Sequence, residues 1–228
     1  MQQEPIAREV KSKLDGIIVN IELTLISIIQ SIPLGILAER AGDPVSHFDW
    51  PVIIYLVVGL LTILLFWSRA LIHTLSFIGW PLDFTHNFLY VGSTLVQCVV
   101  LSQVGNPQSW FAMWTLYAAV LWIMYAVDLR MIRSTEDQES EENGKILLQD
   151  VLDDQLLNVR FYLPIGFVAS AASWWAITQW PDFFIVQGWH MALVGLQFIA
   201  GGLYLLQGYQ ILRRRNERIL TRNVDAVE

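Results

Sequence analysis

The run VIIYLVVGLLTILLFW at residues 52–67 decides the fold of this chain, because it holds no charged side chain over about four helical turns. A helix needs about 20 mostly apolar residues to cross a hydrocarbon layer of about 30 Å. With an extension to residue 72 the run has this length, so we expect a membrane-spanning helix over residues 52–72. A helix is expected because lipid cannot pair with an open backbone and barrel strands are much shorter.

Five further stretches have the same apolar character and the length of a span. They cover residues 16–37, 87–104, 110–127, 161–180 and 183–212. We therefore expect an all-α integral membrane protein in which six helices form a bundle of three helical hairpins. The whole chain, residues 1–228, is then a single membrane domain.

The composition narrows the classes of function. Hydrophobic residues make up 54% of the 228 residues and charged residues 15%, against about 25% charged residues in soluble domains. These values disfavour a water-soluble enzyme. The net charge of -7 disfavours a nucleic-acid partner, which requires a basic surface. The single cysteine, Cys98, excludes an intramolecular disulfide.

The distribution of lysine and arginine predicts the orientation. If the N-terminus is cytoplasmic, every basic residue except Arg40 falls on the cytoplasmic side, with Arg69 at the inner end of the second span. Positive residues favour that side of a membrane, so we expect six spans with both termini in the cytoplasm. The predicted outer loops are short, which favours an integral protein of a bacterial inner membrane in contact with its lipids.

Two cytoplasmic segments have a distinct character. Residues 134–158 begin as an acidic, polar linker and continue with apolar residues at helical spacing, which predicts a short amphipathic helix on the inner surface. The tail at residues 213–228 is rich in arginine. It can contact anionic lipid head groups, or its charge can simply reflect the orientation of the chain.

Polar side chains within the predicted spans are the candidates for a site, because they are unfavourable in lipid. Several of them recur at helical spacing on the first, third and sixth spans. The candidate binding or translocation residues are Asn20, Glu22, Thr24, Gln30, His86, Gln97, His190 and Gln197. Joined together they would line a polar interior. Alternatively, they form hydrogen bonds that hold the helices together.

The fourth span carries an aromatic stripe that ends in a carboxylate. Trp110, Trp114, Tyr117 and Asp128 share one face of this helix. Such a wall can hold an organic cation or a flat ligand. The alternative is core packing, with Asp128 paired to a base near the inner surface, such as Arg130.

Three functions remain open. The leading hypothesis is a small channel or transporter, working as an oligomer, in which Glu22 binds or relays charge and the amides and histidines replace lost hydration. The second is a non-catalytic membrane subunit or scaffold that docks a cytoplasmic protein. The third is a haem-binding redox protein that uses its four histidines as axial ligands.

The chain contains no familiar catalytic or metal-binding motif, so an enzyme is not favoured.

Overall fold

A computed structural model of the chain describes residues 3–76, 84–136 and 142–225, and all its regular elements in these ranges are helical. The α-helices are α1 (Gln3–Ser46), α2 (Trp50–Ser76), α3 (Phe84–Ser102), α4 (Pro107–Glu136), α5 (Glu142–Leu157), α6 (Leu163–Gln179) and α7 (His190–Asp225). Two short π-helical turns, η1 (Asn158–Tyr162) and η2 (Asp182–Val186), follow α5 and α6. The expected all-α architecture is therefore observed.

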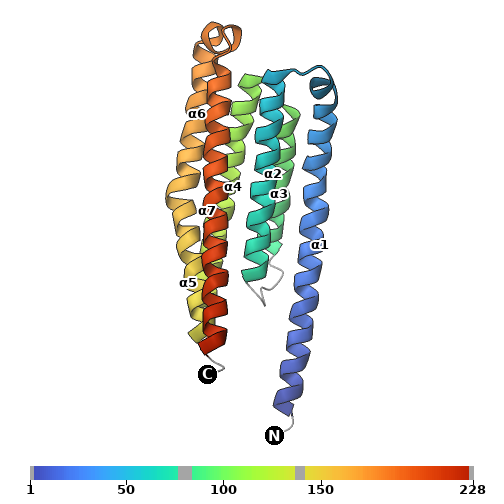
Figure 1. Cartoon of the computed structure of the whole chain (residues 1–228), viewed down its shortest axis with the longest axis vertical. Helices are drawn as coiled ribbons and strands as arrows, with labels where there is room; N and C mark the ends of the chain where they lie inside the picture. The colour runs from blue at the N-terminus through green and yellow to red at the C-terminus, as the bar shows by residue number, and fades with distance from the viewer. Residues whose placement is uncertain (1–2, 77–83, 137–141, 226–228) are drawn as a thin grey trace.

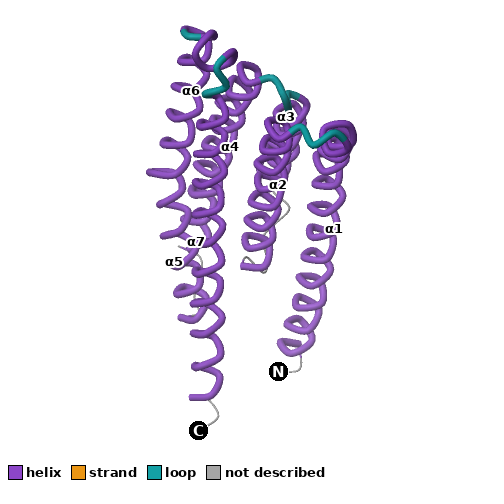
Figure 2. The backbone as a smooth tube through the Cα atoms, turned by 45° about the horizontal axis from the view of Figure 1, so that its top comes forward, coloured by secondary structure: helices purple, strands orange, loops and turns teal. Residues whose placement is uncertain are grey.

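The helices run up and down in an elongated bundle (Figure 1). The start of α1 and the end of α7 lie at the same end of this bundle, which we call the terminal end. Figure 2 shows that the described connections gather at the opposite end, which we call the loop end. Because α5, η1 and α6 form one continuous helical rod, the described residues make six passes along the bundle.

The contacts between helices follow the order α6–α4–α3–α1–α2–α7. The helix α1 contacts both α2 and α3, while α4 contacts α3, α5 and most extensively α6. The last helix, α7, packs against α2. Large aromatic side chains fill the core near the loop end, where the rings of Tyr55 and Trp110 meet edge-on with their centroids 5.1 Å apart.

The α3–α4 connection illustrates why the chain turns where it does. Gly105 has a φ of +85°, a conformation that is accessible to glycine without steric strain. The next residue, Asn106, accepts a hydrogen bond from the backbone N–H of Ser109 at 3.1 Å and so caps the start of α4. Pro107 then occupies the first turn of the helix, where a missing N–H carries no penalty.

Five helical stretches are long and apolar enough to cross a membrane. They are Val19–Ser46, Trp50–Leu71, Pro107–Arg133, Val151–Gln179 and His190–Ile211. Five of the six expected spans therefore have the required length and apolarity. The helix α3 forms as expected but is not among the five, and its 19 residues include His86, Asn87 and Gln97.

Two helix boundaries differ from those expected from the sequence. The sixth expected span begins at His190 instead of residue 183, because η2 and a turn at Gly188, whose φ is +79°, precede it. The expected amphipathic helix continues through η1 into α6 and does not end at residue 158. The centre of the acidic linker, residues 137–141, lies outside the described residues, as do the side chains of most of the basic tail.

Candidate functional site

Polar side chains are buried in this bundle at several depths. Those with little exposed surface are Gln30, Thr62, Arg69, Ser93, Thr94, Gln97, Asp128, Gln155, Asn158 and Ser170. Thr62 is satisfied by its own helix, since its hydroxyl donates to the carbonyl of Val58 at 2.7 Å. The residues described below either contact side chains of other helices or have polar atoms without a hydrogen-bond partner.

A first group, which we call the central seam, consists of Gln30, Tyr90, Thr94 and Gln97. The side-chain amide of Gln30, on α1, donates to the hydroxyls of Tyr90 and Thr94, on α3, at 3.2 Å each. The Thr94 hydroxyl donates in turn to the carbonyl of Tyr90 at 3.1 Å. These bonds tie α1 to α3 through side chains that lie inside the bundle.

Gln97, one turn further along α3, is fully buried, yet neither its amide nitrogen nor its amide oxygen has a hydrogen-bond partner. The oxygen of Gln30, the indole nitrogen of Trp114 and the hydroxyl of Tyr117 are likewise unpartnered. A buried polar group without a partner is rare and destabilises the fold by about 1–3 kcal/mol. The interior of the bundle therefore offers donors and acceptors that the described protein atoms do not use.

A second group joins α1, α3 and α4 near the terminal end. The Nδ1 atom of His86 lies 2.8 Å from a carboxylate oxygen of Asp128, whose side chain is only 3% exposed. Glu22, half-buried on α1, is close enough to His86 for their charges to interact. The partner of Asp128 is thus a histidine on α3, whereas a base near the inner surface, such as Arg130, was expected.

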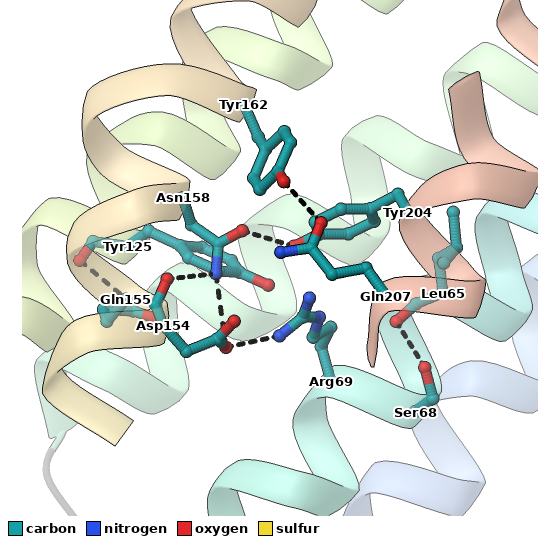
Figure 3. A network of polar contacts seen from close by, with 10 residues as sticks. All are labelled: Leu65, Ser68, Arg69, Tyr125, Asp154, Gln155, Asn158, Tyr162, Tyr204 and Gln207. Atoms are coloured by element: carbon teal, nitrogen blue, oxygen red, sulfur yellow. Dashed lines mark hydrogen bonds and ion pairs between the residues drawn. The ribbon is translucent and has the colours of Figure 1, made fainter. Parts of the chain in front are cut away.

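A third group, which we call the charged cluster, consists of Arg69, Asp154, Asn158 and Tyr204 (Figure 3). The guanidinium of Arg69 donates to a carboxylate oxygen of Asp154 at 2.5 Å, and both side chains are almost fully buried. Its carbon Cζ also lies 4.5 Å from the ring centroid of Tyr204, a cation–π contact. The Tyr204 hydroxyl donates to the Asn158 oxygen at 2.6 Å, and the Asn158 nitrogen donates to the Asp154 carbonyl at 2.9 Å.

The π-helical turn η1 shapes this cluster. It carries both Asn158 and Tyr162, and Tyr162 binds Gln207 on α7 (Figure 3). Pro164 lies two residues after the end of this turn. In a regular α-helix its ring would clash with the carbonyl four residues earlier, and its nitrogen cannot donate. The wider turn just before Pro164 accommodates this constraint. Single π turns of this kind are frequent at functional sites.

The charged cluster was not predicted from the sequence. Arg69 was expected at the inner end of the second span and Asp154 on a surface helix, so neither was expected to be buried. One signal was available, since Asp154 and Asn158 are four residues apart and share a helix face. The partner on α2 could not be found from spacing, because it is distant in the sequence.

The eight predicted site residues do not converge on one interior. Gln30 and Gln97 lie near the middle of the bundle, while Glu22 and His86 lie towards its terminal end. At the loop end, His190 contacts the Tyr55 hydroxyl at 3.0 Å, and Gln197 accepts from the Trp110 indole at 2.9 Å.

Asn20 and Thr24 differ from the other predicted residues because both side chains are exposed on α1. The Thr24 hydroxyl donates to the Asn20 carbonyl at 2.8 Å, within the same helix. The face of α1 that carries Asn20 and Thr24 therefore points away from the rest of the chain.

The described histidine side chains lie at both ends of the bundle. His86 and His190 lie towards opposite ends of the bundle and contact different partners, Asp128 and Tyr55. His47 is exposed beside Asp43, and the side chain of His73 is outside the described set. In the described part of the chain, no group of three or more His, Cys, Asp or Glu side chains could hold a metal ion.

The fold and its apolar helices define the class: this is an all-helical integral membrane protein with buried polar and charged groups. Comparison of the chain with protein-family models, curated proteins and solved structures finds no match.

Proposed function

We propose that this chain is a six-span protein of a bacterial inner membrane that moves an ion or a small polar solute between its helices. Both termini would be cytoplasmic, and α3 would be the sixth crossing. The charge distribution supports this orientation, since all basic residues but Arg40 fall on one side. The position of α3 against α1 and α4 supports its role as a crossing.

The observation that carries this proposal is the unpartnered amide of Gln97. Lipid cannot supply hydrogen bonds in the hydrocarbon layer, so placing a polar side chain there costs free energy. Such a residue typically marks a pathway or a binding site. Gln97 is fully buried and Gln30 leaves its oxygen unused. A passing solute or its water would provide the missing partners, as polar groups in selective pores replace lost hydration.

The other predicted residues have roles at the two ends of this path. Glu22 and His86, with Asp128, place titratable charge at the terminal end, where they can attract or relay an ion. His190 and Gln197 provide polar atoms at the loop end. Asn20 and Thr24 face outwards, so we place them outside the path and within reach of a second copy of the chain.

Reconstitution into liposomes tests the proposal. Proteoliposomes are transferred to isosmotic KCl, NaCl or glycine, with valinomycin or a protonophore to balance charge, and their swelling is followed by light scattering. We expect entry of at least one solute, reduced about tenfold or more in Gln97→Leu, since 1.4 kcal/mol on a barrier changes a rate tenfold. Gln210→Leu, at an exposed glutamine of α7, is the matched control. Equal swelling in empty liposomes and proteoliposomes for every solute would refute the function.

A further inference from the structure

We infer that the ion pair between Arg69 and Asp154 is a gate that keeps the central seam closed at the terminal end of the bundle. This inference rests on the proposed function, because the gate regulates access to the same seam. It adds a conformational role for the charged cluster, which sequence reasoning did not identify.

The ion pair joins elements that otherwise touch little. Among the described residues, α2 and α5 make only a small contact, and Arg69 and Asp154 bridge it through nearly buried side chains. The same guanidinium lies on the ring of Tyr204, so it also holds α2 against α7. Removing one member of a buried ion pair leaves the other charge uncompensated, and this end of α2 would then move to reach water.

One turn of helix connects this pair to the central seam. Phe66 precedes Arg69 on α2, and its ring stacks on Tyr90 with the centroids 5.1 Å apart and the planes 18° apart. Tyr90 in turn accepts the hydrogen bond from Gln30. A displacement of Arg69 therefore carries Phe66 away from Tyr90 and uncovers the polar atoms of the seam.

The bonding of the pair suits a gate that opens. An arginine and a carboxylate can form two parallel hydrogen bonds, but here a single one joins them. Nη2 of Arg69 and Oδ1 of Asp154 have no hydrogen-bond partner. Gly208 on α7 leaves room beside the guanidinium, because a Cβ there would still be 3.8 Å from Nη2. The contact is thus a buried ion pair that is held by one hydrogen bond instead of two.

The single cysteine of the chain provides a direct test. Cys98 is buried on α3 and directly follows Gln97. The rate at which a membrane-impermeant methanethiosulfonate reagent labels Cys98 in the full-length protein, held in lipid nanodiscs at constant pH, reports access to the seam. We expect Arg69→Gln and Asp154→Asn to raise this rate about tenfold or more. The charge-swapped double variant, Arg69→Asp with Asp154→Arg, should bring it back towards the wild-type value.

Two further variants separate a gate from a loosened fold. Phe66→Ala removes the cover itself, so we expect faster labelling with the ion pair intact. Arg130→Gln removes an exposed arginine of α4 near the same end and should leave the rate unchanged. Unchanged labelling in Arg69→Gln and Asp154→Asn overturns the gate, as does equal acceleration in Arg130→Gln or no recovery in the charge swap. If Arg69→Gln does not elute as a single species, Asp154→Asn and Phe66→Ala decide the question.

The gate and the proposed function can fail separately. Accelerated labelling without solute entry in any liposome experiment would leave the gated seam in place and refute transport. Solute entry with unchanged labelling in the ion-pair variants would leave transport in place and refute the gate.

Discussion

Tyr55 and Arg69 lie on the same side of α2, about four helical turns apart. Each contacts a residue of α7, and those two residues are separated by the same number of positions along α7. Tyr55 meets His190 at the loop end, and Arg69 lies on Tyr204 at the terminal end. The two helices are therefore parallel and in register, with one polar contact near each end. Any relative movement of α2 and α7 must change at least one of these contacts.

The contact at the loop end can be weakened without changing the shape of the core. Tyr55→Phe keeps the buried ring and removes the hydroxyl that lies 3.0 Å from His190. We expect a loss of about 1 kcal/mol in the free energy of unfolding, the typical net contribution of one hydrogen bond. Thermal unfolding in detergent measures this difference. Tyr209→Phe, at an exposed tyrosine of α7, should have no effect, and an equal loss there would contradict the assignment.

Between the two polar contacts, a glycine allows α7 to approach α2. A Cβ atom at Gly201 would lie 2.8 Å from a methyl carbon of Leu61, whereas nothing lies within 4 Å of the same position at Gly202. Gly201→Val should therefore destabilise the protein by about 1–3 kcal/mol through overpacking. Gly202→Val introduces the same side chain one residue later without the clash. Equal unfolding temperatures for the two variants would show that α2 and α7 do not pack this closely.

The two glutamines of the central seam should respond in opposite ways to the same substitution. Gln97→Leu removes two unpartnered polar atoms, so the free energy of unfolding should stay the same or increase. Gln30→Leu breaks two hydrogen bonds to α3 and should reduce it by about 1–3 kcal/mol. Chemical denaturation in detergent provides the comparison. A clear loss of stability in Gln97→Leu would indicate a structural role for this amide and weaken the case for a path.

The pair formed by His86 and Asp128 should behave as a coupled unit. A double-mutant cycle with His86→Gln and Asp128→Asn should give an interaction energy of about 0.5–3 kcal/mol, because the two side chains are in contact and Asp128 is buried. The chain contains a matched control in His47 and Asp43, which lie 3.2 Å apart with both side chains largely exposed. Their cycle should give at most a few tenths of a kcal/mol. Similar values for both pairs would contradict a sheltered position for Asp128.

The apolar runs were sufficient to predict where most helices lie. The stretch at residues 52–67 falls within α2, and the Pro107 and Gly105 region ends one helix and begins another as turn chemistry requires. The prediction was less accurate where polar and apolar residues alternate. The helix at α5 was separated from α6, because a π turn that continues a helix has no distinctive pattern in the sequence.

The candidate site could be predicted only in part. Helical spacing placed His86 and Gln97 among the polar candidates, and Gln30 was added because it flanks the stripe on the first span. All three lie inside the bundle or at its edge. The same rule gave equal weight to Asn20 and Thr24, which face outwards. Periodicity shows which residues share a face of one helix, but it does not show which face meets a neighbour.

The sequence alone determined that this is an all-helical protein with membrane-crossing helices, because the length and apolarity of a span are local properties of consecutive residues. Only the tertiary structure decided that Arg69 pairs with Asp154 and rests on Tyr204. That arrangement depends on how α2, α5 and α7 are packed together, and charges so distant along the chain carry no mutual signal in their spacing. The burial that turns them from surface charges into a gate is a property of the assembled bundle.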